Sequence, residues 1–132
     1  MIAYDTNILI YALEGTSSWS KAAQSIVQKG EHEGAALSVL AWQELLTGVV
    51  LHEGDSAELI AVLRDLRATK FVPVNLGICE RAVNLTKRYG RAVYGYDAVH
   101  IATAIENKAK VFITNDKMLT NLRLDEIIIQ GL

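Results

Sequence analysis

Cysteine and proline are nearly absent from this sequence, which contains one of each among 132 residues. The single cysteine, Cys79, excludes an intrachain disulfide, which suits a reducing compartment and leads us to expect a cytoplasmic protein. Long hydrophobic runs are missing as well. No window approaches the roughly 18 uninterrupted apolar residues that a membrane-spanning helix needs, so we expect no membrane-embedded segment.

An excess of charge of one sign is also missing. Lys and Arg number 13 against 15 Asp and Glu, which gives a formal net charge of −2. A chain with this charge does not hold nucleic acid by bulk attraction, so any such contact has to be local. Apolar residues make up 51% of the chain, enough to bury a core, and no linker or repeat divides it. We therefore expect one domain over residues 1–132.

The N-terminal residues 1–13 are apolar enough to suggest a signal peptide. They lack a basic leader, however, and Asp5 interrupts the apolar run. We therefore expect this region to be a buried strand instead of a secretory leader.

Short β-type runs alternate with stretches of helical periodicity along the chain. We expect strands at 2–4, 35–38, 71–74, 111–114 and 127–129, and helices at 18–33, 39–51, 56–69, 77–89 and 97–108, with a short turn after Asp116. This alternation predicts a three-layer α/β/α fold with a central parallel five-stranded sheet. Ligands in such folds bind at the edge where the strands' carboxyl ends meet.

Four acidic residues are candidates for such a site, and this fold would bring two of them, Asp5 and Asp116, to that edge. Asp5 follows the first strand and Asp116 follows the fourth, while Asp97 opens a helix and Glu44 lies in a helix among leucines. For Asp97 and Asp116, a helix N-cap worth about 1 kcal/mol is an equally good explanation. Asp5 favours function, because an unpaired buried carboxylate costs several kcal/mol. Glu44 is a candidate only because the other three acids occur with it.

Convergence of four carboxylates would raise some of their pKa values and destabilise the protein, and a divalent cation would remove that conflict. Oxygen ligands without cysteine or a histidine pair favour Mg²⁺ or Mn²⁺ over Zn²⁺. Such an ion can activate water for attack on a phosphodiester. The hydroxyls of Thr6 and Thr114 stand next to Asp5 and near Asp116, where each could orient a carboxylate or a water molecule, or simply make a turn or capping hydrogen bond.

A basic and aromatic segment directly precedes Asp97. It interleaves Lys87, Arg88 and Arg91 with three tyrosines. The basic residues could contact phosphates and the tyrosines could stack on unpaired bases. An equally good alternative is a solvated helix end with its tyrosines packed on the core.

Three other residues could also serve the site or a partner. His100 stands three residues after Asp97 and hence on the same helix face, although a histidine there is more often a core or supporting residue than a catalytic one. Trp19 and Trp42 could anchor a partner or a dimer contact, although a tryptophan in an amphipathic helix is more often part of the core.

Four short motifs resemble a known family when they are taken together. They are Tyr4-Asp5-Thr6-Asn7, Ser38 with Glu44, Asp97-Ala98-Val99-His100-Ile101-Ala102-Thr103-Ala104, and Thr114-Asn115-Asp116. In this order and at this chain length they resemble the PIN domain, close to the virulence-associated protein C toxins of prokaryotic toxin–antitoxin pairs.

The resemblance covers the whole chain and implies both fold and function. It implies a PIN-like parallel five-stranded sheet, Mg²⁺- or Mn²⁺-dependent endonucleolytic cleavage of single-stranded RNA, a homodimer, and inhibition by a small antitoxin. The family's catalytic and metal-binding acids carry over to Asp5, Glu44, Asp97 and Asp116, with Thr114 in support. None of the four acids is missing.

A different class of protein, a non-catalytic RNA-binding or signalling α/β module, is the alternative. A receiver domain would need an aspartate at the end of its third strand, where this chain has Asn75. A phosphatase with an aspartate nucleophile would need a second aspartate two residues after Asp5, and Asn7 stands there.

Overall fold

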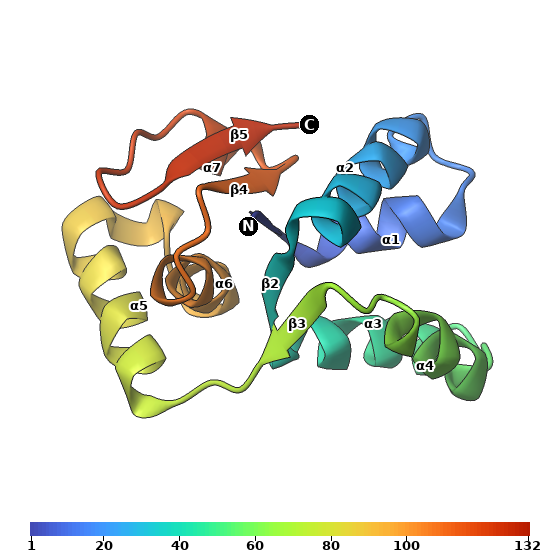
Figure 1. Ribbon diagram of the computed structural model, residues 1–132. Coiled ribbons are helices and arrows are strands. Elements are labelled where there is room, and N and C mark those ends of the chain that lie inside the picture. The colour runs from blue at the N-terminus through green and yellow to red at the C-terminus, as the bar shows by residue number, and fades with distance from the viewer.

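Helices and parallel strands alternate in the computed structural model, which describes all residues 1–132 (Figure 1). The elements in chain order are β1 (Ala3–Tyr4), α1 (Thr6–Glu14), α2 (Ser20–Glu33), β2 (Ala35–Ser38), α3 (Val39–Leu51), α4 (Ser56–Arg64), β3 (Thr69–Val72), α5 (Leu76–Tyr89), the 3₁₀ helix η1 (Gly90–Ala92), α6 (Gly95–Glu106), β4 (Val111–Thr114), α7 (Lys117–Thr120) and β5 (Ile128–Gly131). Among these helices none has the length and apolar character needed to span a bilayer.

The predicted α/β fold is confirmed, but its single five-stranded sheet is split into two parallel ladders. One ladder has the order β1-β4-β5 and the other pairs β2 with β3. A single parallel bridge between Ile2 and Ala35 joins them. The split follows from the shortness of β1, which has only two residues because α1 begins at Thr6.

The apolar stretch predicted to be a buried strand is mostly helix, and this prediction was wrong beyond residue 4. The Asp5 carboxylate caps α1 by accepting a hydrogen bond from the Asn7 backbone at 3.0 Å. The helix ends at Gly15, whose φ of +71° lies in the left-handed region that glycine adopts without strain. The run of apolar residues inside α1 conceals its helical period, which explains the error.

Some other boundaries also differ from those expected. The helix predicted over 56–69 ends at Arg64, because the backbone of Ala68 and the hydroxyl of Thr69 both donate to the Glu31 carboxylate. Strand β3 therefore starts at Thr69, which pairs with Ala35 of β2. Helix α6 starts two residues before Asp97.

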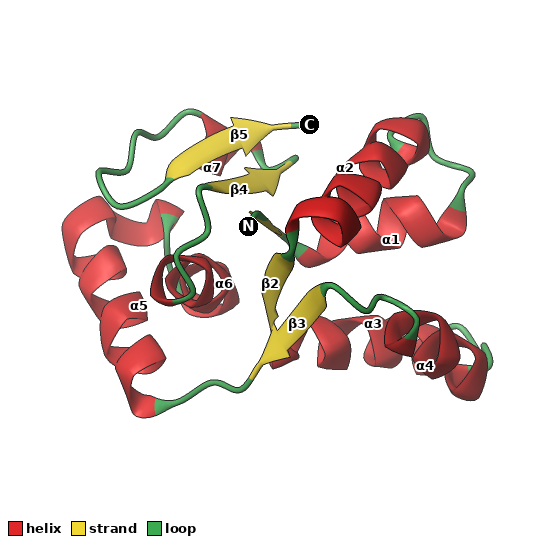
Figure 2. Ribbon diagram, viewed as in Figure 1, coloured by secondary structure: helices red, strands yellow, loops and turns green.

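Two hydrophobic clusters cover the two faces of the sheet. Successive strand residues point to opposite faces, so Ala3 and Phe112 pack with α5 and α6, whereas Tyr4 and Ile113 pack with helices α1 to α4. Figure 2 shows these two groups of helices on either side of the strands. Because β1 pairs in parallel with β4, the residues that follow both strands lie at the same edge.

Candidate active site

Asp5 and Thr114 are brought together by the pairing of β1 with β4. The Asp5 backbone donates to the Ile113 carbonyl at 3.1 Å, and the buried Thr114 hydroxyl donates to Asp5 Oδ2. Asp5 itself is only 9% exposed. Burial raises its pKa above the ordinary value, while the hydrogen bonds from Thr114 and from the backbone of α1 act in the opposite direction.

Asp116 is linked to Asp5 through the same threonine. Its backbone amide donates to Thr114 Oγ1 at 3.0 Å, and its Oδ1 accepts from the Met118 backbone at 2.9 Å. Asp116 is therefore the N-cap of α7, as one of its two interpretations predicted. Its other carboxylate oxygen has no hydrogen-bond partner within the chain and is free for a ligand.

Asp97 lies in the first turn of α6 and does not cap it. The N-cap residue is Tyr94, which makes no side-chain capping bond, so the capping interpretation of Asp97 was wrong. Partial burial raises the pKa of Asp97, and the negative charges of Asp116, Asp5 and Glu44 raise it further. The charges of the other three acids thus act on the Asp97 carboxylate, which has no hydrogen-bond partner within the chain.

Glu44 is held by two donors from other helices. Its Oε1 accepts from the Thr6 hydroxyl of α1 at 3.2 Å and lies 2.7 Å from His100 Nε2 of α6. The hydrogen bond with His100 is the main cause that lowers the pKa of Glu44. The sequence favours a core or supporting role for His100 over a catalytic one. Its spacing of three residues from Asp97 was the available signal.

The donor set fits a hard divalent cation that keeps part of its water shell. All four acids offer carboxylate oxygens, but no three acidic, histidine or cysteine side chains converge closely enough in this structure to hold an ion by themselves. The Asp97 carboxylate has no hydrogen-bond partner, and Asp116 and Glu44 each have one carboxylate oxygen without a partner. Mg²⁺ is usually bound in this way, by few carboxylates together with water.

The three basic residues expected to bind substrate differ in their surroundings. Arg88 is engaged within the chain, since it pairs with Asp125 and with Glu126, the latter at 2.7 Å. Lys87 and Arg91 are exposed and form no ion pair. The structure therefore leaves two of the three predicted cations available at the surface beside α6.

The tyrosines of the same segment also differ from one another. Tyr94 and Tyr96 are 60% and 55% exposed, so the alternative that they pack on the core was wrong for these two. Tyr89 is partly buried and donates to Glu126 Oε2 at 2.8 Å. Two tyrosine rings therefore stand free on either side of Gly95, just before Asp97.

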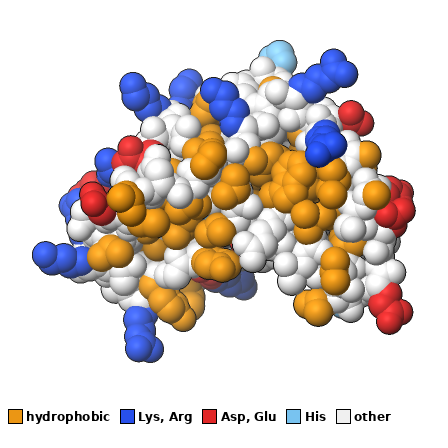
Figure 3. Space-filling view, turned by 90° about the horizontal axis from the view of Figure 1, so that it is seen from below, with side chains coloured by type: hydrophobic (Ala, Val, Ile, Leu, Met, Phe, Trp, Pro, Cys, Tyr) orange, Lys and Arg blue, Asp and Glu red, His pale blue; other side chains and the backbone are white.

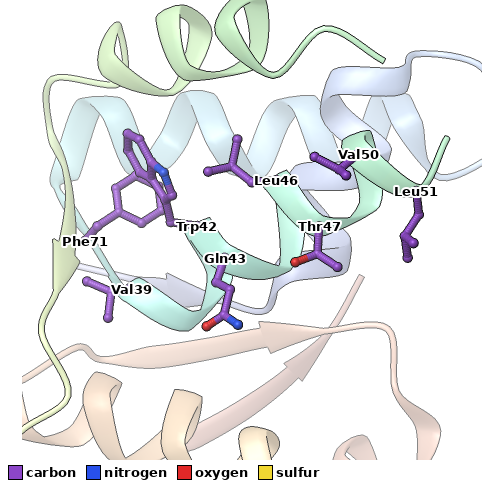
Figure 4. Close-up of a pocket in the computed structure, with 8 residues that line it drawn as sticks. All are labelled: Val39, Trp42, Gln43, Leu46, Thr47, Val50, Leu51 and Phe71. Carbon is purple, nitrogen blue, oxygen red and sulfur yellow. The ribbon is translucent and has the colours of Figure 1, made fainter. Parts of the chain in front are cut away.

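A charge-free groove of about 550 Å³ lies on another face of α3 (Figure 4). Its lining residues are Val39, Trp42, Gln43, Leu46, Thr47, Val50, Leu51 and Phe71. Trp42 packs edge-on against Phe71, with ring centroids 5.0 Å apart. Val50 and Leu51 are 64% and 75% exposed. The face in Figure 3 shows a broad apolar area, with Lys and Arg mainly at its margins.

The chain belongs to the PIN domain family, because the family model for the PIN domain matches residues 2–124. PIN domains are generally nucleases. The family predicted from the four motifs is thereby confirmed, and the chain is similar to the toxin component of VapBC pairs. No curated protein matches the sequence.

Several solved structures share the fold. A toxin–antitoxin complex from Klebsiella pneumoniae contains a chain 25% identical to this one, with 92% of each chain covered and a TM-score of 0.67. VapBC2 from Rickettsia felis, bound to a DNA fragment from its promoter, contains a chain 18% identical, covering 100% of this chain and 99% of that one, with a TM-score of 0.74. VapBC-1 from nontypeable Haemophilus influenzae contains a chain 21% identical, with a TM-score of 0.63 and coverage of 99% and 98%.

Proposed function

We propose that this protein is an endoribonuclease that depends on Mg²⁺ or Mn²⁺ and uses Asp5, Glu44, Asp97 and Asp116. The observation that carries the proposal is the set of hydrogen bonds that links these acids: the Thr114 hydroxyl joins Asp5 to the backbone of Asp116, and Thr6, the residue after Asp5, donates to Glu44. The charges of Asp116, Asp5 and Glu44 add to the effect of burial in raising the pKa of Asp97, which supports including Asp97 with these three acids. The nuclease character of the PIN family supports the same conclusion.

Each residue has a distinct task in this proposal. Asp97 and Asp116 offer free oxygens to the ion, and Asp5 adds a buried charge that Thr114 holds in place. Thr6, the residue after Asp5, supports Glu44 by donating a hydrogen bond to it. When bound, a divalent cation offsets the repulsion among these carboxylates and activates water and phosphate for phosphodiester hydrolysis.

We propose single-stranded RNA, or the unpaired parts of structured RNA, as the substrate. The free rings of Tyr94 and Tyr96 suit stacking on unpaired bases. Lys87 and Arg91 offer local contacts to phosphates. Since the chain carries a net charge of −2, RNA binding is expected to be weak without the metal ion.

The test is cleavage of an end-labelled single-stranded RNA with Mg²⁺, with Mn²⁺ or with EDTA. We expect metal-dependent cutting by the wild type and its near-complete loss in Asp5→Asn and Asp97→Asn. Asp55→Asn is the matched control, because Asp55 also caps a helix but lies on exposed α4. Cutting in EDTA, or full activity in both site variants, would exclude the proposed mechanism.

We further propose that the protein is the toxin of a toxin–antitoxin pair, neutralised by a small cognate antitoxin. The support is that the similar structures above are toxin–antitoxin complexes. Expression of the wild type alone should arrest bacterial growth, and expression of Asp97→Asn should not. Co-expression of a small protein from an adjacent gene should restore growth and yield a stable complex. Growth arrest by Asp97→Asn would contradict the proposal.

We also propose a homodimer that forms through the charge-free groove on α3. Large exposed apolar surfaces are rare on monomeric proteins and usually mark protein contacts. A two-fold contact places each residue near its own copy, so charged residues in it would repel one another. The groove has no charged lining residue, which favours a second copy of this chain over RNA or a charged peptide.

A further inference from the structure

His100 is a buried polar residue on the inner face of α6, where Ala98, Ile101, Ala102 and Ala104 are also buried. It is 6% exposed, and its neighbours Ile101 and Ala102 are completely buried. A buried imidazole requires a hydrogen-bond partner, because an unpaired one loses its interaction with water without compensation. The partner is Glu44 Oε1 at 2.7 Å. Since an ionised carboxylate can only accept, Nε2 is the donor in this hydrogen bond.

The same carboxylate oxygen also receives the hydroxyl of Thr6 at 3.2 Å. Donors from α6 and α1 thus meet on one oxygen of a side chain from α3. A glutamate has several rotatable bonds, and two donors on one oxygen select one of its conformations. They leave Oε2 without a partner in the chain, and this oxygen remains open to water or an ion.

We propose that His100 is a positioning residue that fixes the Glu44 carboxylate for the metal-dependent reaction. This inference rests on the proposed nuclease function. His100 and Asp97 lie one turn apart on α6, so the histidine links Glu44 to the helix that presents Asp97. Outer partners of metal-site residues commonly change metal affinity or activity by about ten- to a hundredfold when they are removed.

Two substitutions separate positioning from packing. His100→Leu keeps most of the side-chain volume but removes the donor. His100→Gln keeps an amide donor at similar reach. If His100 acts by positioning Glu44, the leucine variant should lose about ten- to a hundredfold in Mn²⁺ affinity and in kcat, with an unchanged KM for RNA. The glutamine variant should recover most of both losses. If His100 acted only by packing, the leucine variant would keep more Mn²⁺ affinity and activity than the glutamine variant.

Thr103→Val is the matched control on the same helix. Thr103 is fully buried, and its hydroxyl donates to the Val99 carbonyl one turn earlier and to none of the four acids. This variant removes a buried hydrogen bond from α6 without touching Glu44. Its Mn²⁺ affinity and kcat should stay at wild-type values, even where its thermal stability falls.

The deciding experiment measures Mn²⁺ affinity by calorimetry and cleavage kinetics in a double-mutant cycle with Glu44→Gln. Positioning through Glu44 predicts that His100→Leu adds no further loss in the Glu44→Gln background. The inference would be overturned by additive losses, by equal behaviour of His100→Leu and His100→Gln, or by wild-type Mn²⁺ affinity in His100→Leu. In each of these cases, metal-dependent cleavage by the wild type would leave the proposed function intact. A wild type that neither binds Mn²⁺ nor cleaves RNA would overturn both.

Discussion

At the scale of single residues, the completely buried Thr114 couples two of the four acids. Its hydroxyl donates to Asp5 and accepts from the backbone amide of Asp116. One hydroxyl therefore sets the relative position of the carboxylate after β1 and the backbone after β4. A change at Thr114 would disturb both acids together, which makes it part of the site even though it carries no charge.

The repulsion around Asp97 predicts a stabilising substitution at the candidate active site. The pKa of Asp97 is raised above 3.8 in the folded protein. Between pH 3.8 and the raised value the folded state holds more protons than the unfolded state, so the free energy of unfolding falls as pH rises through this window. Asp97→Asn removes this penalty. In EDTA at pH 7 we expect it to be more stable than the wild type, by under about 1 kcal/mol because the Asp97 side chain is only partly buried and solvent screens its charge.

Urea denaturation with EDTA checks this prediction, and the advantage of Asp97→Asn should disappear below pH 3.8. Added Mn²⁺ should reverse the order, because only the wild type gains binding energy, about 2.7 kcal/mol at a hundred times the dissociation constant. The helix N-terminus attracts a negative charge and acts in the opposite direction. An asparagine variant less stable at pH 7 in EDTA would show that this attraction exceeds the repulsion.

Ion pairing distinguishes the three basic residues expected to bind RNA, since all three are exposed but only Arg88 pairs with acids. Lys87→Gln and Arg91→Gln should each weaken binding of a labelled single-stranded RNA and reduce the salt dependence of log K by about one unit. Arg88→Gln should do less, since its guanidinium is engaged by two acids. Binding is measured by anisotropy with Mg²⁺ in the Asp5→Asn background to prevent cleavage. An equal loss in all three variants would show that Arg88 leaves its partners to bind RNA.

The sequence was sufficient to predict which acids stand at the sheet edge, but not what holds them. Asp5 and Asp116 follow strands, and strand ends can be recognised locally. The contact of His100 with Glu44 joins residues 56 positions apart, and that of Arg88 with Glu126 joins residues 38 apart. Side-chain pairs of this kind depend on how helices pack, and nothing in the neighbouring sequence indicates them.

At the scale of elements, β1 passes into α1 without a loop, and this direct connection affects the form of the sheet. Asp5 ends the strand and caps the helix at once, so β1 has no residues left for a full ladder with β2. Strand direction and number could be predicted from the alternation of strands and helices. The split into two ladders could not be predicted, because α1 is apolar nearly throughout and shows no helical period in the sequence.

Two glycines in helices predict opposite effects of alanine. A Cβ on Gly30 of α2 would lie 3.1 Å from Ala35 Cβ and 3.3 Å from Tyr4 Cε1, both part of the core. A Cβ on Gly48 of α3 would meet nothing within 4 Å. Overpacking lowers the free energy of unfolding by about 1–3 kcal/mol, whereas the higher helix propensity of alanine raises it by up to about 1 kcal/mol.

We therefore expect Gly30→Ala to lower the free energy of unfolding and Gly48→Ala to raise it. Urea denaturation with EDTA checks both. Stabilisation by Gly30→Ala would mean that α2 can move away from the sheet at no cost.

At the scale of the whole molecule, the candidate active site and the apolar groove use different sides of α3. Glu44 points toward α1 and α6, whereas Trp42, Leu46 and Val50 line the groove. One helix can therefore contribute to catalysis on one side and to assembly on another. A dimer formed through the groove would leave Glu44 free to meet metal and RNA.

Leu51→Glu tests this separation of catalysis and assembly. Leu51 is 75% exposed, so the charge should cost little stability in a monomer, but in a two-fold contact it would face the same charge on the second copy. Light scattering should give twice the 14.5 kDa chain mass for the wild type and the single-chain mass for Leu51→Glu. Val83→Glu, at an exposed valine of α5, is the matched control and should remain dimeric. A monomeric wild type would exclude the homodimer, whereas a dimeric Leu51→Glu would place its interface outside the groove.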